Sequence, residues 1–291
     1  MTRKTTLFKQ YVLDKEILVM PGAFDSLSAG IIEKTGFKAV TLGGYPLSAT
    51  ILGKPDVSLL TLTEMVNHTR NIVQAVDIPV FTDGDTGHGN VTNVASTIRE
   101  FEQAGVAGLF IEDQVFPKRC GHMEGKQVVD TIEMVAKIKA AVDARVDEDM
   151  MIMARTDALA VHGLDEAIIR GNIYREAGAD MMFIEAAPAI DDMRRITSEV
   201  DAPLMANMIE GGKTPMLTAE ELAGIGYNVV VFPVSTVYAA AMGIQQAMRT
   251  LYEKGSTREF MKNMMVFDEF NELMGLKEIR TKEAEYYKGI S

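Results

Sequence analysis

An eightfold alternation of strand-like and helix-like segments most constrains how this chain can fold. Eight short apolar runs are candidate strands: Ile17–Ala23, Lys38–Gly44, Pro79–Asp85, Ala107–Asp113, Met150–Asp157, Asp180–Ala186, Pro203–Met208 and Asn228–Val234. Amphipathic segments between them are candidate helices, including Thr61–Val76, Asn90–Gly105, Thr131–Val146, Leu164–Gly178 and Ala219–Gly226. Eight such units predict an α/β fold, a closed parallel (β/α)8 barrel with its helices outside. An open doubly wound sheet is the competing architecture, but no glycine-rich phosphate loop follows the first strand.

The chain continues past the eighth strand-like run into a further helical region. Residues 236–255 form one long predicted helix, and residues 256–291 carry apolar side chains at helical spacing. Such a face must be covered, either by this chain's own barrel or by a neighbouring subunit. We predict a single barrel domain over residues 1–291, with residues 236–291 forming C-terminal helices for oligomer packing. The 20 methionines are interpreted as adaptable core residues.

Composition and charge limit the classes of molecule that this chain can bind. Hydrophobic residues make up 47% of the 291 residues and charged residues 24%, and no apolar run is long enough to span a membrane. The formal net charge of −12 disfavours nucleic acid and anionic membranes as partners, whereas a local cationic pocket can still bind a small anionic substrate. A single cysteine excludes an internal disulfide, and the N-terminal residues contain no apolar signal segment, so we expect a cytoplasmic protein.

Polar side chains gather where the predicted strands end. Because these ends open to one rim of a barrel, we expect the following side chains to converge: Asp83, Asp85, Glu112, Asp113, Arg155, Asp157, Glu185 and Asn207. Asp83 and Asp85 flank one glycine, so both side chains point to the same side and their like charges favour a divalent cation. Oxygen ligands without His or Cys predict Mg²⁺ or Mn²⁺. Asp113 and Asp157 have an alternative interpretation as helix caps.

The only cysteine lies in a cationic loop directly after one of these strand ends. Cys120 is flanked by Lys118 and Arg119 on one side and by Gly121 and His122 on the other. Such neighbours predict a thiol that ionises readily and can exchange a proton near neutral pH. A buried structural cysteine is the alternative, but these polar neighbours are difficult to bury.

A set of motifs now resembles a known family. The motifs are Leu52–Asp56 (LGKPD), Asp83–Asn90 (DGDTGHGN), Ile111–Gln114 (IEDQ), Lys118–His122 (KRCGH) and Met153–Asp157 (MARTD). Together they resemble the isocitrate lyase and phosphoenolpyruvate mutase superfamily over about residues 15–275. The KRCGH motif is typical of its carbon–carbon lyase branch, because the phosphonate branch lacks that cysteine. The resemblance implies a (β/α)8 barrel with a C-terminal helix exchanged between subunits, in a homotetramer built as a dimer of helix-swapped dimers.

The resemblance also implies roles for individual residues. Asp85 would hold Mg²⁺ most directly, and Asp83, Glu112 and Asp56 would act largely through bound waters. Cys120 would be the general acid on a mobile loop over about Phe116–Val129. Tyr45 and Glu185 are candidates for the general base, beside a metal-bound water. The residues implied in substrate binding are Gly43, Gly44, Tyr45, Lys118, Gly121, His122, Arg155, Glu185 and Asn207.

Finer motifs resemble the 2-alkylmalate and 2,3-dimethylmalate lyase branch. They are Gly44–Tyr45, Gly121–Met123, Gly125–Val128, Met208–Gly212 and Thr214–Pro215. Methylisocitrate lyases usually have Ser-Gly-Gly where this chain has Gly43–Tyr45, and an arginine at the position of Tyr238. Without that arginine a third substrate carboxylate lacks its partner, so the resemblance implies a dicarboxylate substrate that carries alkyl groups.

The resulting prediction is a Mg²⁺-dependent carbon–carbon lyase that cleaves 2,3-dimethylmalate, or a related 2-alkylmalate, into pyruvate and propanoate by retro-Claisen chemistry. The alternatives are 2-methylisocitrate lyase, which forms pyruvate and succinate, and oxaloacetate hydrolase. A non-catalytic barrel that binds metabolites is a rival from another class. The retained carboxylates and the Cys120 loop argue against that rival, because a binding module has no use for a general acid.

Overall fold

The computed structural model describes residues 2–289. Within this range, eight strands lie inside the eight predicted runs: β1 (Leu18–Pro21), β2 (Val40–Leu42), β3 (Val80–Asp83), β4 (Gly108–Glu112), β5 (Met151–Thr156), β6 (Met181–Ile184), β7 (Met205–Asn207) and β8 (Val229–Phe232). Apart from the polar residues near their ends, the runs are mainly apolar because both faces of the strands are largely buried, one against the barrel interior and one against the helices.

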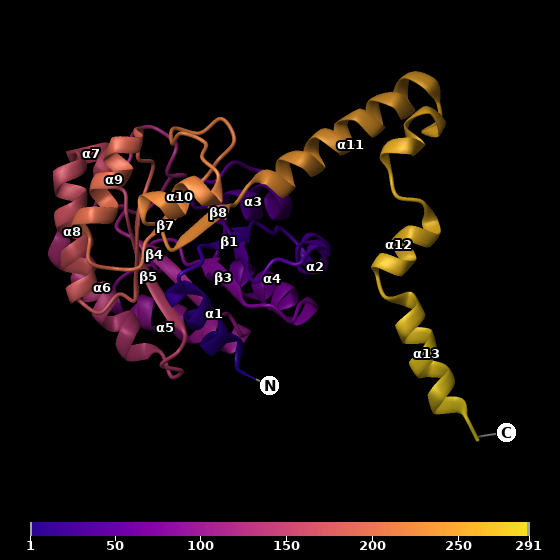
Figure 1. Cartoon of the computed structure of the whole chain (residues 1–291), viewed down its shortest axis with the longest axis horizontal. Coiled ribbons are helices and arrows are strands. Elements are labelled where there is room, and N and C mark those ends of the chain that lie inside the picture. The colour runs from indigo at the N-terminus through magenta and orange to yellow at the C-terminus, as the bar shows by residue number, and fades with distance from the viewer. Residues whose placement is uncertain (1, 290–291) are drawn as a thin grey trace. The chain divides into compact units, whose positions relative to one another are not determined.

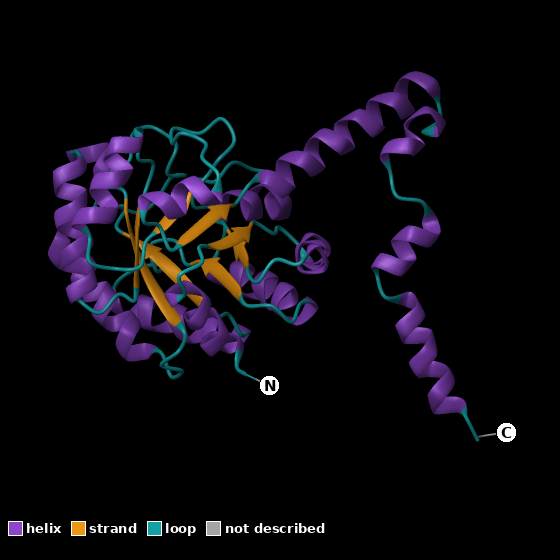
Figure 2. Cartoon of the chain, viewed as in Figure 1, coloured by secondary structure: helices purple, strands orange, loops and turns teal. Residues whose placement is uncertain are grey.

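The strands close into a parallel barrel (Figures 1 and 2). Five of them pair in the order β2-β3-β4-β5-β6, and three in the order β1-β8-β7. Two isolated parallel bridges, Gly22 with Thr41 and Met182 with Leu204, join the two sheets at both seams. The predicted barrel architecture is confirmed, and it places all eight strand ends at one rim.

Ten α-helices belong to the barrel part of the described chain. They are α1 (Lys4–Leu13), α2 (Ser26–Thr35), α3 (Gly44–Leu47), α4 (Leu62–Ala75), α5 (Val91–Ala104), α6 (Thr131–Ala144), α7 (Ala158–His162), α8 (Leu164–Glu176), α9 (Ile190–Glu199) and α10 (Ala219–Ile225). The π-helix η1 (Ser48–Leu52) extends α3 directly after the end of β2. Capping boxes begin α4 and α10, where Thr61 pairs with Glu64 and Thr218 with Glu221.

The apolar core has two layers. One layer lies between the strands and the helices, and the other fills the barrel interior. Phe8 from α1 packs against Phe81 of β3 inside the barrel, with ring centroids 5.4 Å apart. Met20, Met153 and Met181 are also fully buried there, which agrees with the interpretation of methionine as core filler. The core fills the end of the barrel at which the strands begin, and it leaves the rim at which the strands end polar.

The second compact unit of the chain is residues 238–291, after a first unit of residues 1–237. The unit boundary falls within the first turn of α11 (Ser235–Lys254), and the second unit also contains the 3-10 helix η2 (Arg258–Asn263), α12 (Phe267–Leu273) and α13 (Leu276–Tyr287). The long helix predicted over residues 236–255 is present. The last two residues of the predicted range 236–291 lie outside the described residues. The single-domain organisation and the helix exchange stay predictions.

Candidate active site

Residues of seven strands, β2 to β8, and of the segments that follow them line one pocket at the rim where the strands end. β2 leads into Gly43–Tyr45, β3 ends at Asp83, and Arg155 lies near the end of β5. Glu185 follows β6 directly, and Asn207 ends β7. The full lining is Thr41, Leu42, Gly43, Gly44, Tyr45, Pro46, Asp56, Asp83, Phe110, Cys120, Gly121, His122, Arg155, Phe183, Glu185, Met205, Asn207, Ile209, Val231, Pro233 and Val234. The structure therefore brings most of the predicted site residues together.

A buried acidic cluster lies beside this pocket. The Lys118 ammonium nitrogen lies 2.8 Å from Asp56 Oδ2 and 2.9 Å from Asp85 Oδ1, and its side chain is only 2% exposed. Asp83 accepts hydrogen bonds from the backbone N–H groups of Gly44 and Asp85, at 2.9 and 2.8 Å. Lys118, predicted to bind substrate, thus lies among the acidic residues and not in the pocket lining. These carboxylates oppose the cost of burying Lys118 and raise the pKa of its ammonium group well above the usual value.

Several carboxylate oxygens of the acidic cluster, which comprises Asp56, Asp83, Asp85 and Glu112, lack hydrogen bonds. Burial raises the pKa of Asp85 to about 6, although Lys118 acts in the opposite direction. Burial likewise raises the pKa of Glu112 well above its usual value. Asp85 Oδ1 and both Glu112 oxygens are buried without a hydrogen bond: the contacts to Lys118 and Arg155 are charge contacts without hydrogen-bond geometry. Such atoms are costly to bury unless a cation compensates them.

A metal at this cluster would need water among its ligands. Among residues 2–289, no three Asp, Glu, His or Cys side chains surround one point as a ready-made ligand shell. Mg²⁺ usually keeps several waters and takes only one or two protein carboxylates, so the cluster fits Mg²⁺ better than a cation that requires a complete protein cage. Gly44 packs against the cluster, because an added Cβ there would lie 3.0 Å from Asp83 Oδ2.

Arg155 stands at the centre of the site between three carboxylates. Its guanidinium nitrogens lie 3.1 Å from Glu112 Oε2, 2.9 Å from Asp157 Oδ2 and 3.2 Å from Glu185 Oε2. The guanidinium also lies over the rings of Phe110 and Phe183, at 5.8 and 5.4 Å from their centroids. These contacts hold a cation in a fixed orientation at the pocket wall, where it can bind a substrate carboxylate.

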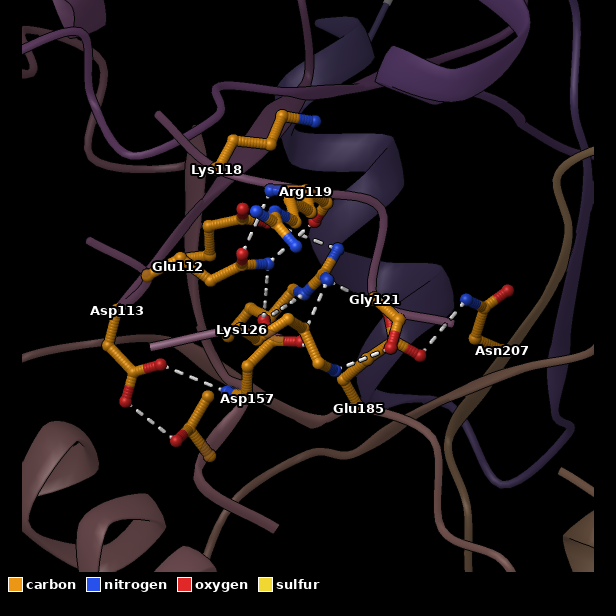
Figure 3. Close-up of polar contacts among 12 residues, drawn as sticks. Glu112, Asp113, Lys118, Arg119, Gly121, Lys126, Asp157, Glu185 and Asn207 are labelled. Atoms are coloured by element: carbon orange, nitrogen blue, oxygen red, sulfur yellow. Dashed lines mark hydrogen bonds and ion pairs between the residues drawn. The ribbon is translucent and has the colours of Figure 1, made fainter. Parts of the chain in front are cut away.

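Glu185, His122 and Asn207 form the opposite wall. Although burial disfavours its charge, Arg155 and His122 lower the pKa of Glu185 to about 2. The Lys213 backbone N–H donates to His122 Nδ1 at 2.9 Å, which assigns the proton of a neutral ring to Nε2, 3.3 Å from Glu185 Oε1. Asn207 Nδ2 donates to the same Glu185 oxygen at 3.4 Å. Glu185 therefore accepts a hydrogen bond from Asn207, as Figure 3 shows, and has nitrogens of Arg155 and His122 as close charge contacts.

The thiol of Cys120 differs from the prediction made from its neighbours. Burial raises the pKa of Cys120 above its usual value, and Glu185 acts in the same direction. The prediction of a readily ionised thiol is wrong, because the flanking Lys118 ammonium is turned toward the acidic cluster and the Arg119 guanidinium toward the Glu124 carbonyl, at 3.0 Å. A protonated thiol at the pocket wall is suited to donating a proton.

The loop that carries Cys120 is closed over the pocket. Gly121 lies so near the opposite wall that an added Cβ would lie 2.4 Å from Glu185 Cγ and 2.5 Å from Arg155 Nη2. The loop has little apolar area, but two buried lysines hold it: Lys118 at the acidic cluster and Lys126 at Asp157. No residue other than glycine fits at position 121 in this closed arrangement.

A second buried network beneath the loop was not predicted. Asp113 accepts hydrogen bonds from Thr156 Oγ1 at 2.7 Å, Tyr174 OH at 2.9 Å and Arg170 Nη1 at 3.1 Å. Asp157 precedes α7 but makes no side-chain cap hydrogen bond, so the interpretation of these two residues as caps does not hold. One signal was present in the sequence: Asp157 follows Arg155 by two residues, which places both side chains on the same face of an extended strand.

Comparisons with known proteins identify the family of this chain. The phosphoenolpyruvate phosphomutase family model matches residues 8–252. The chain is 48% identical to a 2,3-dimethylmalate lyase of Eubacterium barkeri, covering 97% of each chain. It is 39% identical to a 2-methylisocitrate lyase of Aeropyrum pernix, covering 97% of this chain and 91% of that one. This chain belongs to the phosphoenolpyruvate mutase/isocitrate lyase superfamily.

Solved structures place the chain in the same superfamily. A crystal structure of a 2,3-dimethylmalate lyase matches with a TM-score of 0.93 and 32% identity, covering 99% of this chain and 98% of that one. A phosphonopyruvate hydrolase in complex with oxalate and Mg²⁺ matches with a TM-score of 0.89 and 29% identity, covering 99% and 100%. Within the superfamily, the chain is a carbon–carbon lyase. In residues 2–289, no helix combines the length and the apolar character that crossing a membrane requires.

Proposed function

We propose that this lyase cleaves 2,3-dimethylmalate, or a closely related 2-alkylmalate, into pyruvate and propanoate with the help of Mg²⁺. The observation that carries the proposal is the placement of Cys120, whose thiol pKa is raised by burial, at the wall of a pocket that also has the Arg155 guanidinium and borders a buried acidic cluster. A proton donor, an anion site and a cation site are the three groups that a retro-Claisen cleavage of a hydroxy diacid requires.

The reaction needs one proton acceptor and one proton donor. The acceptor takes the hydroxyl proton from C2, the C2–C3 bond breaks, and its electron pair remains on C3. Cys120 then donates its thiol proton to C3, which gives propanoate, while C2 becomes the keto carbon of pyruvate. The proton held by the acceptor returns to the thiolate and restores the enzyme. Asp85, Asp83, Glu112 and Asp56 would hold Mg²⁺, and the bound ion would supply positive charge that stabilises the negative oxygens.

The proton acceptor is assigned to Tyr45 in preference to Glu185. Arg155 and His122 hold the pKa of Glu185 near 2, so this carboxylate is a weak base in the closed site. Tyr45 lies at the start of α3 and lines the pocket near the acidic cluster. Glu185 is then left to orient His122 and the substrate.

The pocket lining favours a diacid with alkyl groups over a triacid. Arg155 and His122 are the basic side chains among the described lining residues, and they face one end of the pocket. The backbone of Gly43–Tyr45 and the acidic cluster's cation would bind the other carboxylate. The remaining wall is apolar and suits methyl groups: Phe110, Phe183, Met205, Ile209, Val231 and Val234. A third carboxylate buried against this wall would cost several kcal/mol.

A pyruvate assay tests the proposal directly. The purified protein is incubated with 2,3-dimethylmalate, other 2-alkylmalates, 2-methylisocitrate and oxaloacetate, with Mg²⁺ or with a chelator. We expect pyruvate and propanoate from the 2-alkylmalates, in Mg²⁺ only. Pyruvate with succinate as the preferred products would favour methylisocitrate lyase, and oxalate with acetate would favour oxaloacetate hydrolysis. Binding of the acids without any turnover would support a non-catalytic barrel.

We also propose that the enzyme is a cytoplasmic homotetramer built from helix-swapped dimers. The C-terminal unit supports this proposal, because its helices carry apolar side chains that the single chain leaves exposed, among them Met242, Met248, Phe267, Phe270 and Met274. Helices with such faces are stable when a second subunit covers them. Light scattering should give a tetramer, and a monomer at micromolar concentration would contradict the proposal.

A further inference from the structure

Three side chains converge on Asp157 beneath the Cys120 loop. Asp157 is 0% exposed. Its Oδ2 accepts hydrogen bonds from Arg155 Nε at 2.9 Å and from Gln114 Nε2 at 3.2 Å. Its Oδ1 accepts from Lys126 Nζ at 2.7 Å and from Arg155 Nη2 at 3.1 Å. One carboxylate therefore holds the end of β5, the segment after β4 and the returning half of the loop.

Two of these side chains continue to the peptide groups on either side of Cys120. Gln114 Nε2 donates to the Arg119 carbonyl at 2.8 Å, and Gln114 Oε1 accepts from the Arg119 N–H at 3.0 Å. Lys126 Nζ donates to the Gly121 carbonyl. The residues directly before and after Cys120 are thus each tied to Asp157 through one side chain, as the labelled Arg119, Gly121, Lys126 and Asp157 show in Figure 3.

Capping of α7 does not explain the burial of Asp157. Its side chain does not cap α7, and its backbone N–H is held by Asp113 Oδ1 at 2.9 Å. Lys126, whose side chain is 2% exposed, could extend into water from a loop at the rim. Burying an ion pair such as Lys126–Asp157 is costly unless both charges have well-placed hydrogen-bond partners. Such pairs are best explained where they fix a single conformation of the surrounding chain.

We infer that Asp157, acting through Gln114 and Lys126, sets the position of Cys120 relative to Arg155 when the loop is closed. The proton donor and the carboxylate-binding guanidinium then share one anchor, so neither can shift without the other. Gln114, Lys126 and Asp157 do not line the pocket and are positioning residues. The inference rests on the proposed function only for the role of Cys120 as proton donor.

The single cysteine of the chain allows a test that needs no substrate. Iodoacetamide can modify only Cys120, so its alkylation rate reports how well the loop is held. We expect Lys126→Met to raise this rate about tenfold or more at fixed pH, because the Gly121 tether is lost. The matched control is Lys137→Met, since Lys137 is also buried but pairs with Glu133 on α6, at 3.3 Å. Its rate should stay within about twofold of wild type.

Measurements of kcat and KM distinguish a positioning role of these residues from a general loss of stability. Lys126→Met leaves the Arg155–Asp157 contact intact, so kcat should fall about tenfold or more while KM changes less than about threefold. Asp157→Asn weakens the anchors of both Cys120 and Arg155, so kcat should fall and KM should rise. Gln114→Leu carries no charge change and should repeat the Lys126→Met result, which keeps the test decisive if one variant fails to fold.

The outcomes distinguish this inference from the proposed function. If no acid of the panel is cleaved but Lys126→Met still exposes Cys120, the substrate assignment fails and the anchoring role stands. If 2,3-dimethylmalate is cleaved but Lys126→Met and Gln114→Leu keep wild-type alkylation rates and kcat, the anchoring role is overturned. Thermal unfolding curves measured beside each assay identify variants that lose the fold.

Discussion

The ammonium nitrogen of Lys118 lies 2.9 Å from Oδ1 of Asp85, so a cation from the Cys120 loop occupies the edge of the proposed metal site. Lys118 is almost fully buried there, and Asp56 is its second partner, at 2.8 Å. In the closed loop, Lys118 therefore places a positive charge within the acidic cluster. Any cation that binds the cluster must act against the Lys118 charge.

This relationship predicts that Lys118→Met binds Mg²⁺ more tightly than wild type in the absence of substrate. Two like charges a few ångströms apart repel by several kcal/mol at a protein surface, so a tenfold tighter Kd, about 1.4 kcal/mol, is a conservative expectation. Titration calorimetry measures it, with Lys137→Met as the control for loss of a buried lysine. Equal or weaker Mg²⁺ binding in Lys118→Met would show that Lys118 does not oppose the metal.

Asp85→Ala should abolish turnover and leave the barrel folded. The change removes the carboxylate predicted to hold the metal most directly, at a polar rim and away from both layers of the apolar core. We expect kcat to fall by at least about a hundredfold. Pyruvate release at several Mg²⁺ concentrations and a circular dichroism spectrum check the two halves of the claim. Full wild-type activity in chelator would contradict the metal assignment.

The fold and most of the pocket could be predicted because they depend on local periodicity. Each predicted strand run contains an observed strand, and parallel topology brings the strand ends to one rim, which is why Asp83, Arg155 and Asn207 meet. The ionisation of Cys120 could not be predicted in the same way. It depends on where Lys118 turns and on how deeply the thiol is buried, and both are set by residues distant in sequence.

The role of Asp157 was obscured for a related reason. An aspartate at a strand end just before a helix has the sequence signature of a cap, and the two functions differ only in the tertiary partners. Those partners, Gln114 and Lys126, come from outside the strand. The spacing to Arg155 was a usable signal, because it places two opposite charges on one face of a strand.

The raised pKa of Cys120 gives a prediction of pH dependence. A thiol can donate only while protonated, so kcat should fall as pH rises through the pKa of Cys120. Burial moves that pKa above the usual value of 9.0, so this loss should appear only on the alkaline side of pH 9. The kcat profile and the pH dependence of iodoacetamide alkylation in the substrate-free enzyme should give the same direction of shift. A thiol that titrates near neutral pH would contradict the closed-loop geometry.

Tyr174→Phe should destabilise the protein with little effect on kcat. Tyr174 is 0% exposed, and its hydroxyl donates to Asp113 Oδ2 at 2.9 Å, in the network beneath the loop. Removing it leaves a buried carboxylate short of one donor, which costs about 1–3 kcal/mol of unfolding free energy. Urea unfolding measures the loss. Tyr11→Phe is the control, since Tyr11 presents its ring to Lys38 Nζ at 5.6 Å. Equal stability of both variants would show that the network contributes little.

Substrate choice provides the last prediction. The described pocket lining has Arg155 and His122 as its basic side chains. The family resemblance implies that a methylisocitrate lyase would have an arginine at the position of Tyr238. If the third carboxylate of 2-methylisocitrate costs about 3 kcal/mol, kcat/KM for 2,3-dimethylmalate should be greater by about a hundredfold. Tyr238→Arg should narrow this ratio, whereas Tyr252→Arg should not. Comparable constants for both acids in wild type would favour methylisocitrate lyase, and an unchanged ratio in Tyr238→Arg would remove Tyr238 from the substrate site.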